Sequence, residues 1–428
     1  MNIRDVLLEQ KIELDEVMNR KDLINREVQD KFKSIRESSL SKIITGIRRA
    51  GKSTLLYLLL KNIDYGYINF DDINLYGIEA PDIFNNFIEL YGNVRNVFLD
   101  EVQNLKNWEL FVNNLQTSYN VFITGSNSNL LSSELSSHLT GRHIQLELFP
   151  LSFREYSLFK DNLNFATIRK QNLIKNNLKF YLDNGGFPEI VIGNEIRNVY
   201  LTRLYTDIIE KDIIMRHDIN QKKTFIDIAN FIMNSFTGYI SYNKLTNNFS
   251  VGSVHTVKNY LNYLAESYLV FFLDKYSYKE IEIQKSIKKA YIVDNGFINI
   301  LNRNSLDVGK SLENAVAIDL KRRSFNENFN IYYWKDYSDY EVDFVIKKDI
   351  DFKALIQVTY ALDEKDINTR EIRALLKASD ALKCYNLIVI TWNYSAITTY
   401  EKKKINFIPA WQWFLETDMN QLYHHREI

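Results

Sequence analysis

The chain of 428 residues is too long for one ordinary hydrophobic core and predicts roughly two to four domains. Its 53 Lys and Arg residues against 54 Asp and Glu give a formal net charge of −1, which excludes a chain that is basic overall, so nucleic-acid binding has to be argued from a local surface. A hydrophobic share of 46% lies far from the composition of disordered chains, so we expect the protein to fold.

Few residues are available for disulfide or zinc chemistry. The single cysteine, Cys384, cannot form an intrachain disulfide, and the six histidines lack the spacing of zinc ligands. The first residues are charged, unlike a signal peptide, and no run of 18 apolar residues suggests a membrane span. We therefore expect a cytoplasmic protein that does not enter a membrane.

The first part of the chain alternates between short apolar runs and helical patterns. We expect strands at residues 42–45, 67–70, 97–99, 121–123 and 144–148, with helices between them. Such alternation is typical of a mostly parallel sheet with helices on both faces. The predicted fold class of this part is therefore α/β.

A phosphate-binding pattern follows the first predicted strand and precedes an apolar helix. It consists of Gly46, Ile47, Arg48, Arg49, Ala50, Gly51, Lys52, Ser53 and Thr54. Its backbone N–H groups can wrap a phosphate, Lys52 can reach the β- and γ-phosphates, and the Ser53 hydroxyl can bind Mg²⁺. We expect ATP or ADP to bind here with Mg²⁺; the alternative is a plain glycine turn.

The third predicted strand ends in two acids, Asp100 and Glu101. Asp100 can hold Mg²⁺ through water, and Glu101 can orient and deprotonate the attacking water. The alternative is two acids that merely solvate a loop. The pair favours hydrolysis over binding alone.

Two further elements carry candidate catalytic groups. The fourth predicted strand ends near Thr124 and Ser126, either of which can contact the γ-phosphate, and the sequence does not choose between them. Arg142, just before the fifth strand, can stabilise transition-state charge on the nucleotide of a neighbouring subunit. That role predicts a homo-oligomer; the alternative is a surface arginine paired with a local carboxylate.

These motifs together resemble AAA+ ATPases of the P-loop class. More narrowly, the chain resembles a prokaryotic family of AAA+ ATP-binding proteins whose C-terminal domain is of unknown function, and residues 185–189 and 290–296 also match that family. Gly185 and Gly186, in the segment at 185–189, predict a tight turn between helices of a lid, and we expect their role to be structural.

We expect four domains in chain order. They are an ATPase core with an N-terminal helix at residues 1–160, a helical lid or connector at 161–240, a winged helix-turn-helix at 241–295, and a mixed α/β domain at 296–428.

The second helix of the predicted winged helix, at residues 254–268, is expected to expose His255, Lys258, Asn259 and Asn262. These residues form a polar face that fits a DNA groove. This face has one fixed positive charge, so phosphate attraction requires nearby lysines to gather beside it, namely Lys275, Lys279, Lys285, Lys288 and Lys289. The alternative is a module that contacts a protein.

The last domain resembles the restriction-endonuclease-like core, in which a helix glutamate, a strand aspartate and a Glu-x-Lys pair bind Mg²⁺. Glu313 and Asp343 match the first two positions, whereas Gln357 and Thr359 replace the pair. An amide is a weaker ligand than a carboxylate, and threonine supplies no cation. The resemblance therefore implies a nuclease-derived scaffold that is inactive.

The leading hypothesis is a Mg²⁺-dependent ATPase whose hydrolysis rearranges the C-terminal modules, with DNA as a candidate partner. The first alternative is a nucleotide switch of slow turnover that binds a protein or DNA. The second is a nuclease gated by ATP.

Overall fold

The computed structural model describes residues 2–19, 22–92, 94–128, 143–160, 167–193, 196–301 and 307–416. The chain divides into two compact units. Unit 1 comprises Met1–Leu151 and Glu266–Tyr268, and unit 2 comprises Ser152–Ala265 and Leu269–Ile428. No described helix has both the length and the apolar composition needed to cross a lipid bilayer.

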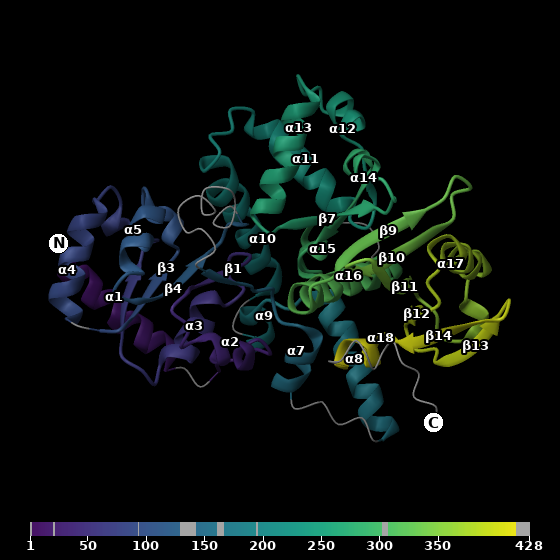
Figure 1. Ribbon diagram of the computed structural model, residues 1–428, viewed down its shortest axis with the longest axis horizontal. Helices are drawn as coiled ribbons and strands as arrows, with labels where there is room; N and C mark the ends of the chain where they lie inside the picture. The colour runs from purple at the N-terminus through teal and green to yellow at the C-terminus, as the bar shows by residue number, and fades with distance from the viewer. Residues whose placement is uncertain are drawn as a thin grey trace. The chain divides into compact units, whose positions relative to one another are not determined.

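Unit 1 contains a five-stranded sheet in the order β2-β3-β4-β1-β5, and every pairing in it is parallel (Figure 1). The strands are β1 (Ser41–Thr45), β2 (Tyr65–Asn69), β3 (Asn96–Asp100), β4 (Asn120–Gly125) and β5 (His143–Glu147). All five predicted strands are therefore confirmed within a few residues. β4 is inserted between the strand that precedes the phosphate loop and the strand that carries the acids.

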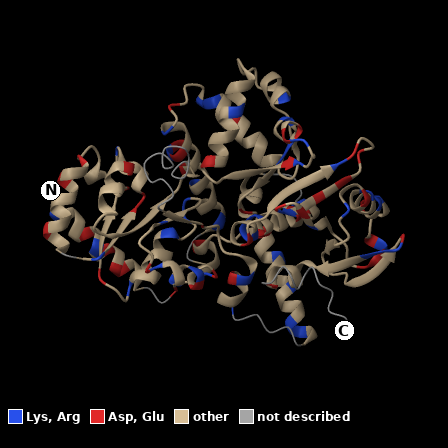
Figure 2. Cartoon of the chain, in the orientation of Figure 1, with Lys and Arg blue, Asp and Glu red and all other residues tan. Residues whose placement is uncertain are grey.

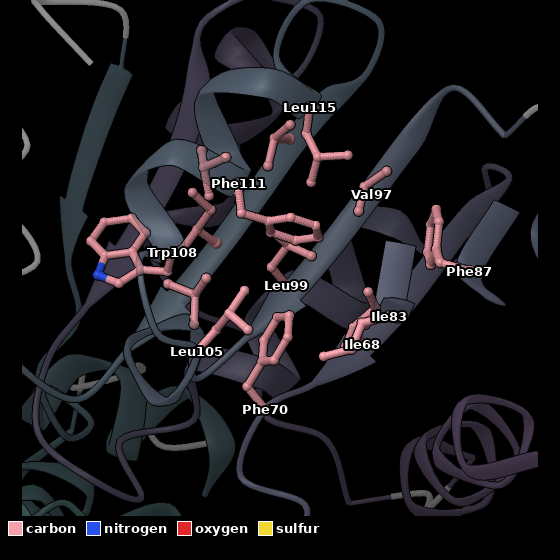
Figure 3. Packing of buried hydrophobic residues seen from close by; sticks show 14 of the residues in the cluster. Ile68, Phe70, Ile83, Phe87, Val97, Leu99, Leu105, Trp108, Phe111 and Leu115 are labelled. Atoms are coloured by element: carbon pink, nitrogen blue, oxygen red, sulfur yellow. The ribbon is translucent and has the colours of Figure 1, made fainter. Parts of the chain in front are cut away.

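The described helices of unit 1 cover this sheet. They are α1 (Ile3–Met18), α2 (Gln29–Ile35), α3 (Lys52–Leu60), α4 (Ala80–Tyr91) and α5 (Trp108–Leu115). Val97 and Leu99 of β3 point to one face, where Phe111 of α5 joins the same buried cluster (Figure 3). Phe98, between them, points to the other face and packs against the Tyr67 ring at 4.9 Å between centroids. Because both faces are covered, the strands are continuous apolar runs in the sequence.

Unit 2 begins with helices, as the sequence predicted. They are α7 (Phe153–Phe159), α8 (Ile168–Asn184), α9 (Pro188–Ile192), α10 (Arg197–Asp207), the π-helical segment Ile208–Met215, and α11 (Lys222–Asn234). The next described elements are β6 (Tyr239–Ile240), α12 (Tyr242–Asn248), α13 (Val254–Glu266), β7 (Val270–Lys275), α14 (Glu280–Lys285), β8 (Lys288–Ile292) and α15 (Gly296–Leu301).

The remainder of unit 2 is mixed α/β. Its elements are α16 (Val308–Glu327), β9 (Asn330–Lys335), β10 (Glu341–Lys348), β11 (Asp351–Thr359), α17 (Thr369–Leu382), β12 (Leu387–Thr391), β13 (Ala396–Tyr400), β14 (Lys403–Pro409) and α18 (Ala410–Leu415). All strands from β6 onward join one nine-stranded sheet in the order β13-β14-β12-β11-β10-β9-β7-β8-β6 (Figure 1). The parallel pairing of β7 with β9 carries this sheet across the domain boundary expected at residue 295.

The two family-like segments of unit 2 meet in space. The Asp294 carboxylate accepts hydrogen bonds from the backbone N–H groups of Gly186, at 2.7 Å, and Gly296, at 2.8 Å. Gly185 has φ +80°, and a Cβ on it would lie 1.7 Å from Asp294 Oδ1. The glycine turn between α8 and α9 therefore seats a buried carboxylate.

Candidate functional site

The phosphate loop has a backbone that requires its glycines. Gly46 has φ +143°, and a Cβ on it would lie 2.0 Å from the carbonyl oxygen of Leu148. Gly51 has φ +94° and immediately precedes α3, whose N-terminus therefore faces the loop. The nonglycine Arg49 is also left-handed, with φ +67°. Any larger residue at position 46 would push the loop away from the segment that follows β5.

A buried arginine braces the loop from a segment that the sequence did not mark. Arg26, 8% exposed, donates from Nη1 to the Ala50 carbonyl at 2.9 Å and from Nη2 to the Phe149 carbonyl at 2.7 Å. One guanidinium thus ties the loop to the segment after β5. No motif or spacing distinguishes Arg26 from other arginines in the sequence.

Lys52 is the first residue of α3, and its side chain is 4% exposed. Its Nζ donates to the carbonyl oxygens of Gly46 at 3.1 Å and Ile47 at 3.3 Å. The same Nζ lies 3.6 Å from Glu101 Oε1. The ammonium is therefore held across the loop, beside the second acid of β3.

Asp100 ends β3 and receives three hydroxyl groups. Its Oδ1 accepts from Ser53 Oγ at 2.9 Å and from the Thr124 hydroxyl, and its Oδ2 accepts from the Tyr67 hydroxyl at 3.0 Å. Burial, and then the charge of Glu101, raise the pKa of Asp100 to about 6 against the lowering effect of these hydrogen bonds. The structure thus brings Ser53, Asp100 and Thr124 together.

Glu101 adopts a left-handed backbone, with φ +50°. Its Oε2 accepts from Gln103 Nε2 at 2.5 Å and from the backbone N–H of Ser126 at 3.2 Å. Burial alone would raise the pKa of Glu101, but Lys52, then the Gln103 hydrogen bond and Arg48, lower it below its usual range. Adjacent acids with opposite pKa shifts are suited to different roles. Glu101, with a lowered pKa, stays ionised at pH values where Asp100, with a pKa of about 6, is partly protonated.

Thr124 and Ser126 have different surroundings. The Thr124 hydroxyl donates to Asp100 and accepts from the Glu101 N–H at 3.1 Å, so it links both acids. Ser126 Oγ lies 3.4 Å from Gln103 Nε2. Which of the two contacts the γ-phosphate stays a prediction. Arg142, with Thr140 and Gly141 before it, lies outside the described residues.

Unit 2 brings together Glu313, Asp343 and Gln357 of the endonuclease-like resemblance, with two additions. Gln357 Nε2 donates to Asp343 Oδ2 at 2.8 Å. The additions are Glu341 of β10 and Lys289 of β8. Lys289 Nζ lies 2.8 Å from Glu313 Oε1, 2.8 Å from Glu341 Oε1 and 3.1 Å from Asp343 Oδ1.

This position bears on the condition for DNA binding that the sequence set. Phosphate attraction by α13 requires Lys289 to lie on a basic surface beside it, but Lys289 is only 3% exposed. Its neighbour Lys288 is paired with Asp274. These two lysines therefore do not meet the condition for phosphate attraction, because carboxylates already neutralise them.

Comparison with known families divides the chain into three parts. A family described as an AAA domain matches residues 38–157. Two families described as domains of unknown function, DUF8612 and DUF4143, match residues 175–307 and 308–413. Unit 1 therefore contains an AAA domain, whereas the two later matches leave the endonuclease-like resemblance unconfirmed.

Two relatives match most of the chain. An uncharacterized protein of Methanocaldococcus jannaschii is 37% identical over 94% of this chain and 93% of its own length. An uncharacterized protein of Haemophilus influenzae is 27% identical over 88% of this chain and 95% of its own. Among solved structures, a Walker-type ATPase of Pyrococcus abyssi is 14% identical, with a TM-score of 0.40, over 66% of this chain and 97% of that chain.

Proposed function

The chain belongs to the same family as the Methanocaldococcus jannaschii protein, and from its AAA domain and the geometry of the site we propose that unit 1 is a Mg²⁺-dependent ATPase. The observation that carries this proposal is the contact of Ser53 with Asp100, next to the pairing of Lys52 with Glu101. The residues proposed as phosphate ligand, metal ligands and general base lie at the carboxyl ends of β1 and β3, where α/β sheets bind ligands, and this supports the proposal.

The side chains fit a magnesium ion. Ser53 and Asp100 present oxygen atoms 2.9 Å apart, and oxygen is the donor that Mg²⁺ prefers. These two residues would hold the ion, which when bound neutralises charge on the β- and γ-phosphate oxygens. The backbone N–H groups of the loop and the Lys52 ammonium would bind the phosphates themselves.

Glu101 would take the proton of the attacking water. Without nucleotide its Oε1 is paired with Lys52, and its Oε2 is held by Gln103 and the Ser126 N–H. A triphosphate carries more negative charge than one carboxylate and competes for the lysine. Glu101 Oε1 is then released to accept a proton, while Oε2 stays hydrogen-bonded. The Thr124 hydroxyl, which contacts Asp100 and the Glu101 N–H, would fix the two acids relative to each other.

Steady-state ATP turnover with Mg²⁺ tests this proposal. We expect a kcat above about 0.1 s⁻¹, a threshold that lies below the usual range of kcat for enzymes. Glu101→Gln should abolish it and retain nucleotide binding, because the amide keeps the shape of the side chain but cannot accept the proton. Lys52→Ala should lose binding.

The slow nucleotide switch is favoured by the same ion pair, which engages Glu101 Oε1 in the chain without nucleotide. Turnover near zero in the wild type, together with tight ATP or ADP binding, would establish the switch in place of the enzyme. Calorimetry with both nucleotides provides the binding measurement.

DNA binding and a winged helix are finer parts of the proposal. The support is local: α12 and α13 are followed by the antiparallel strands β7 and β8, and His255, Lys258 and Asn262 of α13 are exposed. Lys and Arg are interspersed with Asp and Glu over the described elements of unit 2 (Figure 2). A protein partner is therefore the alternative occupant of this face.

Salt-dependent binding of a labelled DNA duplex separates these partners. Lys258→Glu should weaken binding and lower the salt slope by about 1, whereas the control Lys222→Glu on α11 should not. Absence of binding at low salt would remove DNA from the proposal.

We also propose that hydrolysis rearranges the C-terminal modules and that the protein works as a homo-oligomer in the cytoplasm. The trans role of Arg142 motivates the oligomer. Light scattering with and without ATP and Mg²⁺ tests it, and a monomer under both conditions would remove that role.

A further inference from the structure

A lysine lies at the centre of three carboxylates in unit 2. Lys289 comes from β8, Glu313 from α16, and Glu341 and Asp343 from β10. The three N–H donors of its ammonium match three acceptors, one oxygen from each acid, at 2.8, 2.8 and 3.1 Å. The side chain of Lys289 is 4% exposed, so these contacts take the place of its water shell.

Each carboxylate is also held by a second contact. Asp343 Oδ2 accepts from the side chain of Gln357 at 2.8 Å and from the Val358 N–H at 3.0 Å. Glu313 Oε1 accepts from the Tyr291 hydroxyl at 2.9 Å, and Glu341 Oε2 accepts from the Tyr239 hydroxyl. The acids therefore cannot turn away from the centre without breaking other hydrogen bonds.

The charges require a cation at this point. Three acids gathered around one point repel one another, and burial raises the pKa of Glu313 to about 7 despite the lysine. Burial would lower the pKa of Lys289, but the surrounding acids and Tyr291 raise it well above its ordinary value, so the ammonium stays charged. The lysine and the acids stabilise each other's ionised forms.

We infer that Lys289 occupies the position that a divalent cation would take among Glu313, Glu341 and Asp343, and that it closes this cluster to metal. Divalent ions bind carboxylate oxygens at about 2.0–2.6 Å. An ammonium already in contact with one oxygen of each acid fills that centre, and a second cation there would meet its charge at close range. The cluster connects β8, α16 and β10, and it leaves no site for the metal ion that metal-dependent hydrolysis requires. This inference is independent of the ATPase proposal.

Mn²⁺ titration of the full-length, nucleotide-free chain, followed by electron paramagnetic resonance, tests the inference. Wild type and Asp343→Asn should bind the same number of Mn²⁺ ions, because any ion at Asp100 is common to both. Lys289→Ala should gain one ion per chain with a Kd of about 10⁻³ M or tighter, the range of weak carboxylate sites. The double variant Lys289→Ala with Asp343→Asn should lose that ion again.

A second variant guards against misfolding, because Lys289→Ala leaves three acids without a cation. Lys289→Met combined with Glu341→Gln removes one charge of each sign and keeps Glu313 and Asp343 as ligands, and it should gain the same ion. Lys289→Arg retains a cation and should gain none. A wild-type ion that Asp343→Asn removes would overturn the inference, as would a folded Lys289→Ala or Lys289→Met/Glu341→Gln chain that gains no Mn²⁺. If neither folds, equal binding by wild type and Asp343→Asn supports it.

Discussion

The Lys52 ammonium lies 3.6 Å from the Glu101 carboxylate, so the expected phosphate ligand and the expected general base neutralise each other in the nucleotide-free chain. The other Glu101 oxygen is held by Gln103, a residue of the same turn that the sequence did not single out. The readiness of the base therefore depends on contacts from both sides of its side chain.

Gln103→Ala should lower kcat about tenfold and leave nucleotide affinity nearly unchanged. A hydrogen bond to a charged group contributes about 1.5–3 kcal/mol, and about 1.4 kcal/mol corresponds to a factor of ten in rate. Since Gln103 lowers the pKa of Glu101, the acid limb of the kcat–pH profile should also move to higher pH. That second measurement separates positioning of the base from a general loss of structure.

Asn104→Ala is the matched control for this change. Asn104 belongs to the same turn, but its side chain donates to Asp71 at 3.2 Å and does not contact Glu101. Equal loss of kcat in both variants, with no shift of the acid limb, would show that the turn as a whole is required and would contradict a specific role for Gln103.

The raised pKa of Asp100 predicts a pH-dependent cost in stability. Its pKa is about 6 in the folded chain, against about 4 for an unfolded aspartate. Between those values the folded state binds the proton and the unfolded state does not, so the free energy of unfolding falls as pH rises through this window, by up to about 3 kcal/mol. Asp100→Asn, which cannot ionise, should escape this fall.

Thermal unfolding of the two proteins with a chelator and without nucleotide measures the difference. The difference in melting temperature, Asp100→Asn minus wild type, should increase between pH 4 and pH 7, even though we expect the variant to lose ATPase activity. A constant difference across that range would show that Asp100 is already ionised in the folded chain at low pH.

Gly185→Ala should destabilise unit 2 by more than about 3 kcal/mol. The new Cβ would meet Asp294 Oδ1 at 1.7 Å, and the residue would have to keep φ +80°. Gly193→Ala is the control, because Gly193 has a similar φ of +88° with no atom within 4 Å of the added Cβ. Denaturant unfolding should therefore show the strain alone, about 1–2 kcal/mol, in the control.

Much of unit 1 was predictable because its strands are buried on both faces. Such strands appear as continuous apolar runs, and the glycines of the loop are required by its backbone, so spacing located them. β13 and β14 do not show this pattern. β13 alternates between half-buried and exposed residues at the edge of its sheet. β14 begins with Lys403 and Lys404, and Asn406 interrupts its apolar residues.

Residues that act through distant partners were not predictable from spacing. Arg26, Tyr67 and Gln103 belong to no motif, and their roles exist only because the fold brings the loop and the acids to them. The burial of Lys289 was not predictable for the same reason. In the sequence it stands among other lysines, whereas the acids that bury it are at least 24 positions away.

The pairing of β7 with β9 has a practical consequence for dissecting this protein. A fragment that starts at residue 296 would lose β7 and leave the backbone groups of β9 open along one side. Unpaired edges of that kind recruit strands from other chains, so such a piece should aggregate rather than report on the intact molecule. Truncations meant to isolate the C-terminal strands should therefore begin before β6.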